Sequence, residues 1–88
     1  MSFSIEFLTA SDAEDWAHDE LIENSNHPSD RSDMIATARE LIAGIDVRGN
    51  DFWRDYGFAL DSKDAERYAA ETAFIQAAMA YWLDYARY

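Results

Sequence analysis

The chain has 88 residues, 49% of them apolar and 15% aromatic, and a formal net charge of −11. This composition predicts a single folded domain over residues 1–88 and excludes a disordered acidic tail, which would be poor in apolar and aromatic residues. The large excess of acids excludes direct binding to nucleic acid and to anionic membranes, because both need a basic surface.

The sequence also limits the compartment in which the protein works. It contains no cysteine, so it has no disulfide framework and fits a reducing environment. The amino terminus, MSFSIEF, lacks the basic start and the long apolar stretch of a signal peptide. No run approaches the ~20 apolar residues that span a bilayer. We therefore expect a soluble, cytoplasmic protein.

The start of the chain contains an alternating pattern. Phe3, Ile5 and Phe7 share one side of residues 2–8, and polar side chains occupy the other. A period of two favours a short strand, and an extended arm packed on helices fits equally well. A strand would need a partner, and residues 56–60 repeat the alternation. The expected fold class is therefore mainly α, or α+β with a minimal two-stranded sheet.

The first helix is expected over residues 12–23. Ser11 and Glu14 have the spacing of a capping box. The following apolar residues recur at helical spacing, and a breaker-rich segment at 24–29 ends the pattern. The apolar stripe of this helix consists of Ala13, Trp16, Ala17 and Leu21.

A second helix is expected to begin near Ser32, with Asp33 in its first turn, where a negative charge suits the helix dipole. Gly44 is expected to mark the end of this helix, and residues 48–51 are expected to form a turn. Residues 52–57 are short and aromatic, and we expect them to add one helical turn.

The last helix is the longest element that the sequence predicts. It is expected to run from an N-cap at Asp61 to the end of the chain, about 40 Å at ~1.5 Å per residue. From Ala73 to Leu83 the only polar residue is Gln76. A helix that is apolar on all sides is either the central rod of the fold or a surface that binds another chain. We expect three to four helices packed around this 61–88 helix, through which a homodimer could also form.

Few residues point to catalysis or to metal binding. The two histidines, His18 and His27, belong to no metal-ligand pattern, and Glu14 beside His18 supplies too few ligands for zinc. The sequence has no nucleophile elbow, no glycine-rich phosphate loop and no cysteine nucleophile. We therefore expect no metal, no cofactor and no enzymatic activity.

Acidic residues are concentrated near the start of the chain. Eight of the 18 acids lie within the first thirty residues, which contain no lysine or arginine, and six of these lie between Asp12 and Glu23. Like charges at helical spacing destabilise an isolated helix by about 0.2–0.5 kcal/mol per pair, so stability alone would not select this arrangement. One stripe of the helix holds Asp12, Asp15, Asp19 and Glu23, while Glu14 projects from the far flank and Glu20 lies toward the apolar side.

Two interpretations of this acidic helix remain open. Its six carboxylates over about 18 Å give one negative charge per ~3 Å, close to the ~3.4 Å between phosphates along one strand of duplex DNA. One interpretation is a phosphate mimic that occupies a basic nucleic-acid groove on a partner. The other is a solvated face that only keeps the protein soluble.

Aromatic residues would supply the rest of an interface, because Trp and Tyr are frequent anchors of protein contacts. We expect Trp16 and Trp82 in the core, and Trp53 at the surface together with the tyrosines near the carboxyl end. The predicted partner-binding residues are Asp12, Glu14, Asp15, Asp19, Glu20, Glu23, Trp53 and Tyr56.

The chain as a whole resembles phage-encoded inhibitors of bacterial defence in its size, its acidity, its helical pattern and its lack of cysteine. These families include anti-CRISPR proteins and antirestriction DNA mimics, and the run Gly49–Trp53 is similar to a GxDFW stretch of small phage proteins. The resemblance implies that the partner is a basic nucleic-acid-binding protein of the host. It also implies that the chain blocks the DNA-binding channel of a CRISPR effector or of a restriction enzyme in the host cytoplasm.

A second resemblance is to the immunity proteins of nuclease colicins, which are small, acidic and four-helical. The run His-Pro-Ser at 27–29, followed by residues 32–35, is similar to a run in that family. Two extra residues interrupt the run here, and Ala36 and Thr37 replace a tyrosine pair. This resemblance implies an acidic binder of a basic nuclease.

Overall fold

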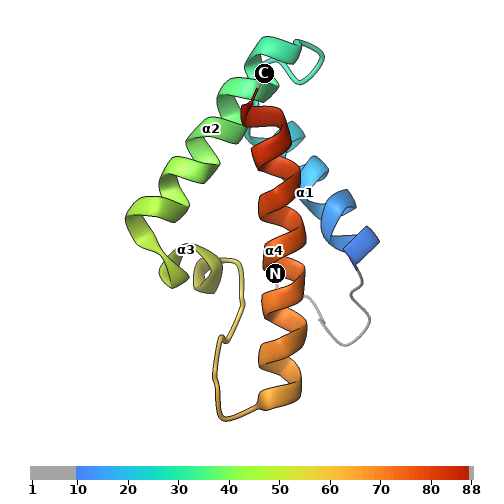
Figure 1. Ribbon diagram of the computed structural model, residues 1–88. Coiled ribbons are helices and arrows are strands. Elements are labelled where there is room, and N and C mark those ends of the chain that lie inside the picture. The colour runs from blue at the N-terminus through green and yellow to red at the C-terminus, as the bar shows by residue number, and fades with distance from the viewer. Residues whose placement is uncertain (1–9, 88) are drawn as a thin grey trace.

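The computed structural model describes residues 10–87, which contain four α-helices (Figure 1). No strand occurs among these residues, so the fold is mainly α, the first of the two expected classes. The helices are α1 (Ala10–Asn24), α2 (Arg31–Arg48), α3 (Asn50–Asp55) and α4 (Ala65–Ala86).

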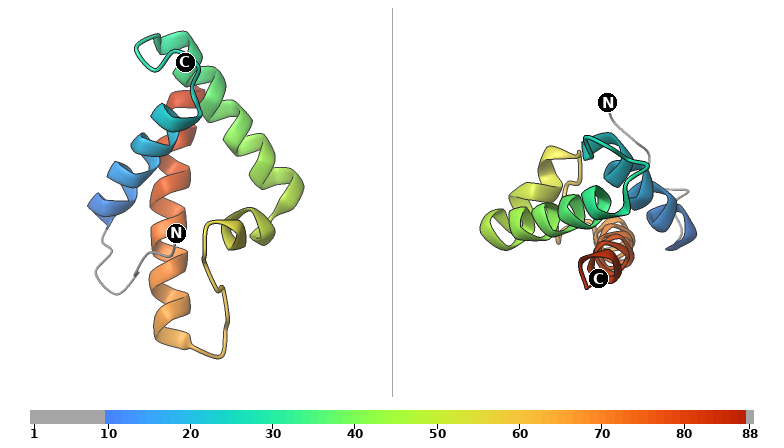
Figure 2. Two further views of the ribbon diagram at one scale, coloured as in Figure 1. Left: turned by 180° about the vertical axis from the view of Figure 1, so that it is seen from behind. Right: turned by 90° about the horizontal axis from the view of Figure 1, so that it is seen from above.

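The helices are arranged around α4. The helices α1 and α2 meet at the loop between them and diverge from it, and α4 packs against both (Figure 1). Figure 2 shows from behind and from above that α1 and α2 lie on one side of α4. The short α3 lies at the far end of α2, and a loop of residues 56–64 leads from it to α4. The long carboxyl-terminal helix is therefore the central element that the sequence predicted.

The two ends of α4 differ in their surroundings. Its carboxyl end lies near the α1–α2 loop, whereas its first turns extend past the other helices (Figure 1). Residues 65–70 are all exposed, and the buried positions of α4 begin at Glu71. The 22 residues of α4 span about 33 Å, compared with 41 Å for the longest extent of the molecule.

The amino ends of α1 and α2 differ from those predicted. Because α1 begins at Ala10, Ser11 lies inside the helix and is not its N-cap. Because Asp30 is the N-cap of α2, this helix begins at Arg31. The Asp30 carboxylate accepts a hydrogen bond from the N–H of Ser32 at 2.9 Å.

Gly44 does not end α2, and the prediction that it would was wrong. The helix continues to Arg48. A Cβ at Gly44 would lie 3.5 Å from the ring of Phe52, which is ordinary van der Waals contact, so the ring packs beside this position without requiring a glycine there. The helix ends instead at Gly49, which has a φ of 59° and donates its N–H to the Ile45 carbonyl at 2.7 Å. A glycine takes up this conformation without the steric cost of a side chain.

Residues 56–60 form a loop, not the predicted strand. The predicted partner strand, residues 2–8, lies outside the described residues. The loop turns at Gly57, which has a φ of 103°. Its backbone N–H groups at Ala59 and Leu60 donate to a side chain of α4, so they are satisfied without a neighbouring strand.

The side chain that accepts these bonds is Glu71, which is fully buried at 0% exposure. Its two carboxylate oxygens accept from the N–H of Ala59 at 2.7 Å and from the N–H of Leu60 at 2.9 Å. The Nε atom of Arg67 lies 3.7 Å from one of these oxygens. Leu60 has a φ of 48°, a left-handed conformation that leucine rarely adopts. The buried carboxylate therefore holds the α3–α4 loop in a conformation that its own residues do not favour.

The start of α4 also differs from the prediction. The helix begins at Ala65, because Asp64 is its N-cap and accepts from the N–H of Arg67 at 3.3 Å. Asp61, the predicted cap, accepts instead from the N–H of Lys63 at 3.0 Å and closes the turn before the helix.

The core is a cluster of aromatic rings around Trp82. This residue is fully buried, as predicted, and its Nε1–H donates to the backbone carbonyl of Ala17 at 3.0 Å. Its indole stacks on that of Trp53, with 5.6 Å between the ring centroids and 11° between the planes. Trp16 lies 5.7 Å from Trp82 and is partly buried against the core. One side chain of α4 therefore joins α1 and α3.

Replacement of Glu71 by Gln should lower the free energy of unfolding by about 1–3 kcal/mol. The amide has only one acceptor oxygen, so one of the two loop N–H groups loses its buried partner. Urea unfolding measures the change. The matched control is Glu66→Gln, at an exposed position of the same helix, which should change the stability by no more than about 0.5 kcal/mol. Equal free energies of unfolding for the two variants would show that Glu71 does not hold the loop.

Candidate partner-binding surface

Most acidic residues of α1 lie on the side of the helix away from the core. The buried side chains of this helix are Ala13, Ala17 and Leu21. On the opposite side lie the exposed carboxylates, as their spacing predicted, together with the exposed Ile22. We use the name acidic face for the exposed residues Glu14, Asp15, Asp19 and Glu23 together with the half-buried Asp12.

The four exposed members of the acidic face form no ion pair within residues 10–87. The sequence places no lysine or arginine on α1, and the structure brings none from the other helices to these four carboxylates. Their charge is therefore displayed to solvent. Four arginines pair instead with acids of α3 and α4, namely Arg48 with Asp55, Arg54 with Asp51, Arg67 with Glu71 and Arg87 with Asp84.

The mean number of these exposed charges per ångström of helix axis is close to that of phosphates along one strand of DNA. From Glu14 to Glu23 the helix presents four exposed carboxylates over ten residues, or about 15 Å. This is one charge per ~3.8 Å, compared with ~3.4 Å along one strand of duplex DNA. The density is slightly lower than the sequence suggested, because not all six predicted acids are exposed.

Glu20 is the acid that differs from the others. It is half-buried, and its carboxylate accepts a hydrogen bond from the Tyr56 hydroxyl at 3.1 Å and another from the Asn24 side chain at 3.3 Å. Burial raises the pKa of Glu20 above its usual range, and the negative charge of Glu23 raises it further. The hydrogen bond from Tyr56 stabilises the charged carboxylate and so acts in the opposite direction. The position of Glu20 toward the apolar side of the helix is the one that the sequence predicted. Glu20 connects α1 to the end of α3.

Tyr56 follows α3 and faces α1. Its ring is half-buried and meets that of Trp16 edge-on, with 5.1 Å between the centroids. Burial raises the pKa of Tyr56 to about 12, and the neighbouring carboxylate of Glu20 adds to this shift because it disfavours a second negative charge. The Tyr56 hydroxyl is therefore engaged within the molecule.

Trp53 is not a surface contact, contrary to the prediction. It is 2% exposed and stacks on Trp82 in the core. The turn at Gly49 redirects the chain so that both Phe52 and Trp53 pack inward. The Gly49–Trp53 run, which resembles a stretch of small phage proteins, therefore has a packing role in this chain.

A hollow of about 510 Å³ lies beside the acidic face. In it the Nδ1 atom of His18 and the hydroxyl of Tyr81 are 2.7 Å apart, and the two rings meet edge-on. Burial raises the pKa of Tyr81, and the Tyr85 hydroxyl and the charges of Glu14 and Asp15 add to the shift. An aromatic ring flanked by carboxylates can hold a lysine or arginine side chain. Asp19 completes the lining.

The sequence did not reveal this hollow. His18 and Tyr81 are 63 residues apart, so no local spacing pairs them. Tyr81 and Tyr85 were expected to be exposed, but both are half-buried and their rings lie 5.4 Å apart. The only indication in the sequence was that His18 lies on a helix that has six acids between Asp12 and Glu23.

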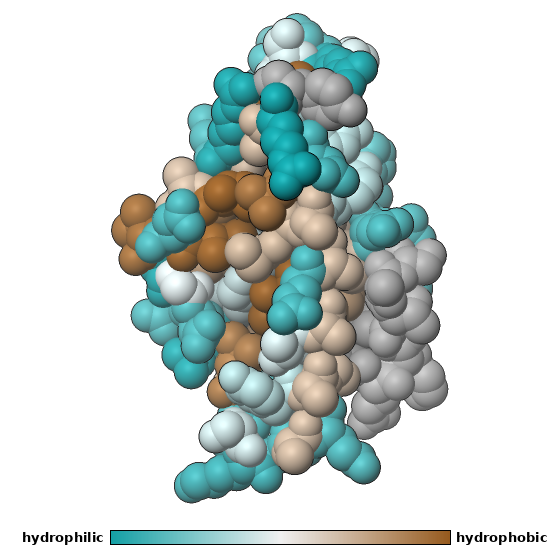
Figure 3. Space-filling view, in the orientation of Figure 1, coloured by the Kyte–Doolittle hydropathy of each residue, from teal (hydrophilic) through white to brown (hydrophobic). Residues whose placement is uncertain are grey.

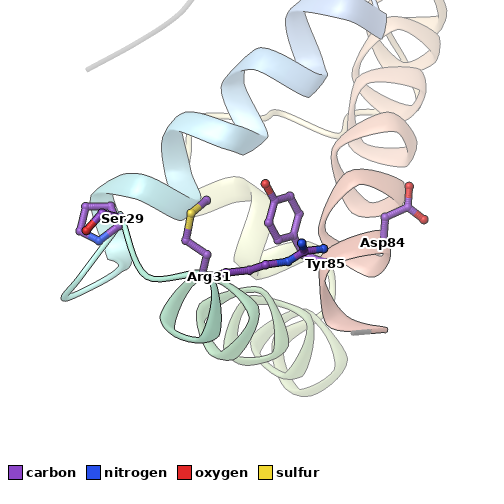
Figure 4. Close-up of a pocket in the computed structure, with 6 residues that line it drawn as sticks. Ser29, Arg31, Asp84 and Tyr85 are labelled. Atoms are coloured by element: carbon purple, nitrogen blue, oxygen red, sulfur yellow. The ribbon is translucent and has the colours of Figure 1, made fainter.

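A second hollow, of about 440 Å³, lies where the α1–α2 loop meets the carboxyl end of α4 (Figure 4). Arg31 extends from the start of α2 toward Tyr85, and Asp84 points away from them. The other residues that line this second hollow are Pro28, Ser29 and Met34. This hollow has a mixed charge, because one cation, Arg31, and one acid, Asp84, line it.

Residues 10–87 contain neither a metal-ligand group nor a helix that could span a membrane. No group of three or more His, Asp or Glu side chains within residues 10–87 could hold a metal ion. None of the helices in this range is long and apolar enough to cross a membrane.

No family model, no curated protein and no solved structure matches the chain. The acidic face and the hollow beside it are therefore the features from which a function can be inferred.

The bond between Tyr56 and Glu20 should make stability depend on pH in alkaline solution. The folded pKa of Tyr56, about 12, lies above the ordinary 10.0, so the stability that its protonated hydroxyl contributes is fully present below pH 10 and is lost as the pH rises through about 12. The difference in unfolding free energy between the unmodified chain and Tyr56→Phe should therefore shrink over this interval. Urea unfolding at a series of pH values measures it.

The control for this experiment is Tyr68→Phe, which removes an exposed hydroxyl from α4. The difference in unfolding free energy between Tyr68→Phe and the unmodified chain should not shrink over this pH interval as that of Tyr56→Phe does. A constant difference for Tyr56→Phe across the interval would contradict the role of the Glu20 bond.

Proposed function

We propose that this chain is a non-enzymatic inhibitor that binds a basic nucleic-acid-binding protein through the acidic face of α1 and competes with DNA. The observation that supports it most is the row of four exposed carboxylates that form no ion pair within residues 10–87. The resemblance to phage-encoded inhibitors suggests the partner class, a CRISPR effector or a restriction enzyme of a bacterial host.

The cost of this arrangement to α1 supports a role in binding. Asp19 and Glu23 lie in the second half of the helix, toward the negative end of its dipole. A carboxylate in the last turn, such as that of Glu23, is unfavourable by about 0.3–1 kcal/mol, and neither Asp19 nor Glu23 forms an ion pair with another residue of the range 10–87. Solubility alone could be supplied by charges at less costly positions, and the chain already has exposed acids at such positions, namely Glu40 in the middle of α2 and Glu66 in the first turn of α4.

The hollow beside the acidic face gives the proposed interface a specific contact. A guanidinium or ammonium group of the partner can lie against the ring of Tyr81 while Asp15 and Asp19 neutralise its charge. The proposed contact set therefore includes the acidic face, His18 and Tyr81. It omits Trp53, which is buried, and Glu20 and Tyr56, which bind one another.

A net charge of −11 also affects the rate of binding. Complementary charge accelerates the encounter of two proteins and makes association sensitive to salt. A partner with a DNA-binding groove presents the required positive field. The same chemistry would serve against a basic nuclease, which is what the second resemblance implies.

Replacement of Asp19 by Asn together with Glu23 by Gln should weaken inhibition about tenfold, because each lost charge pair contributes roughly 0.5–1 kcal/mol. The assay measures binding of target DNA by purified CRISPR effectors and restriction enzymes with increasing amounts of the chain, at low and at high salt. A colicin-type nuclease in the same assay tests the alternative partner. Thermal stability should stay the same or rise, because repulsion within α1 falls.

The matched control is Glu40→Gln with Asp46→Asn, which removes the same charges from exposed positions on α2. Its inhibition should stay within about twofold of the unmodified chain, since nonspecific steering is the only contribution it loses. If the two double variants inhibit equally, the acidic face is a solubilising surface and the proposal is wrong. Failure of the unmodified chain to inhibit any of these enzymes would exclude this class of partner.

A further inference from the structure

The outward side of α4 is apolar over most of its length. Its alanines are exposed, and the larger side chains of Tyr68 and Leu83 remain 41% and 38% exposed. Figure 3 shows this side of the molecule, where apolar atoms follow α4 and extend toward α2. We use the name α4 face for Tyr68, Ala69, Ala73, Gln76, Ala80 and Leu83.

Charge is absent from the α4 face, although the chain is strongly acidic. Between Tyr68 and Leu83 the only charged residue is Glu71, which is buried on the opposite side of the helix. Thr72, at the edge, donates its hydroxyl to the Tyr68 carbonyl at 2.7 Å and so keeps its polar group within the helix. The polar groups on the α4 face are then the Gln76 amide near its centre and the Tyr68 hydroxyl at one end. An apolar surface of this length on a small protein marks an interaction site.

We propose that the α4 face binds the same face of a second copy of this chain, in an antiparallel, two-fold symmetric dimer. The face is self-complementary about Gln76: Ala69 and Leu83 each lie seven residues from it, on opposite sides. A two-fold axis at Gln76 therefore places the leucine of each copy against the small alanine of the other. The alanines between them allow the two helices to approach closely.

Gln76 is the second reason that the occupant is another copy. Its amide contains two donor hydrogens and an acceptor oxygen. At a two-fold axis, the two Gln76 amides can therefore donate to and accept from one another. A partner with a different sequence would have to supply its own matched polar group at this point, since a buried amide without a partner is costly.

The charges at the ends of α4 favour the antiparallel orientation. The amino end of α4 has Asp64, Glu66 and Arg67, and the carboxyl end has Asp84 and Arg87. About an axis at Gln76, antiparallel pairing brings Glu66 of one helix near Arg87 of the other and Arg67 near Asp84, whereas parallel pairing would place each of these charges beside its own copy. It also gives a neighbour to the first turns of α4, which extend past the other helices (Figure 1).

This dimer would leave the acidic face accessible. Since α1 packs on the other side of α4, two copies that meet through their α4 faces carry their acidic faces on the outside (Figure 2). The dimer does not depend on the inhibitory function proposed above. It would double the number of acidic faces in one particle.

Sedimentation over a range of concentrations tests the proposal. The unmodified chain should approach twice its mass of 10.1 kDa. Ala80→Glu places a charge near the centre of the α4 face and should raise the dimer dissociation constant at least tenfold. The control Ala43→Glu makes the same change at an exposed site on α2 and should leave the dimer intact. Circular dichroism confirms that both variants remain helical.

A monomer at every concentration would overturn the proposal, whatever else covers the α4 face. Equal dissociation constants for Ala80→Glu and Ala43→Glu would overturn it too, because the dimer would then use another surface.

Cysteine cross-linking tests the orientation, because the natural chain contains no cysteine. A mixture of Ala69→Cys and Leu83→Cys chains should form disulfides mainly between the two kinds of chain. Disulfides mainly within each kind would show parallel pairing. A dimer that forms no disulfide at these positions would use a different surface. Either result would overturn the proposed arrangement.

Salt distinguishes this dimer from binding of a basic partner. Screening weakens the repulsion between two chains of −11 charge, so added salt should preserve or tighten the dimer. It should weaken the association of the acidic face with a basic protein. A dimer that dissociates as salt is added would be held by charge pairs and would contradict an apolar interface. Each proposal can therefore fail without the other.

Discussion

The hydrogen bond from Trp82 to the Ala17 carbonyl, within a cluster of stacked rings, is the contact on which the rest of the structure depends. It joins the last helix to the first, and the stacking of Trp82 on Trp53 adds α3 to the same cluster. An indole N–H that is buried needs a partner, so this bond also fixes the rotation of α1 against α4. With Ala17 facing Trp82, the exposed carboxylates of α1 must point outward.

The acids of this chain serve at least three different physical purposes. Glu71 is buried and accepts two backbone N–H groups, which makes it part of the fold. Glu20 is half-buried and binds Tyr56, which ties two helices together. The four exposed carboxylates of the acidic face form no ion pair with any other residue of the range 10–87, so no such pair offsets the repulsion between them. A net charge of −11 therefore conceals a division between acids that stabilise the fold and acids that are available to a partner.

Helical periodicity was enough to predict the mainly α fold, the central position of the last helix and the outward orientation of the acidic face. These features follow from local spacing, which a sequence displays directly. The ends of helices were less predictable, because Asp61 and Asp64 have the same capping chemistry and only tertiary packing selects between them. Gly44 was misleading for a related reason, since the ring of Phe52, which packs against it, belongs to the next helix.

Contacts between distant segments could not be predicted. The sequence predicted a turn at residues 48–51 but not that this turn directs the ring of Trp53 into the core. The burial of Glu71 is not indicated by its spacing along the helix, although the loop that it holds is the segment just before that helix. The hollow that His18 shares with Tyr81 joins opposite ends of the chain. Each of these depends on where the chain folds back, which spacing along one helix does not encode.

Because of the hydrogen bond between Trp82 and Ala17, the acidic face depends on the folding of nearly the whole chain. The two residues are 65 positions apart, so almost the whole chain must be in place before they meet. An isolated α1, with like charges along it and no compensating cations, would be a poor helix in water. The surface is therefore assembled only in the native state, and loss of the core would abolish the proposed binding without any change in the carboxylates themselves. Stability and the proposed recognition are then one cooperative property, and a mutation far from α1 can abolish both by shifting the folding equilibrium.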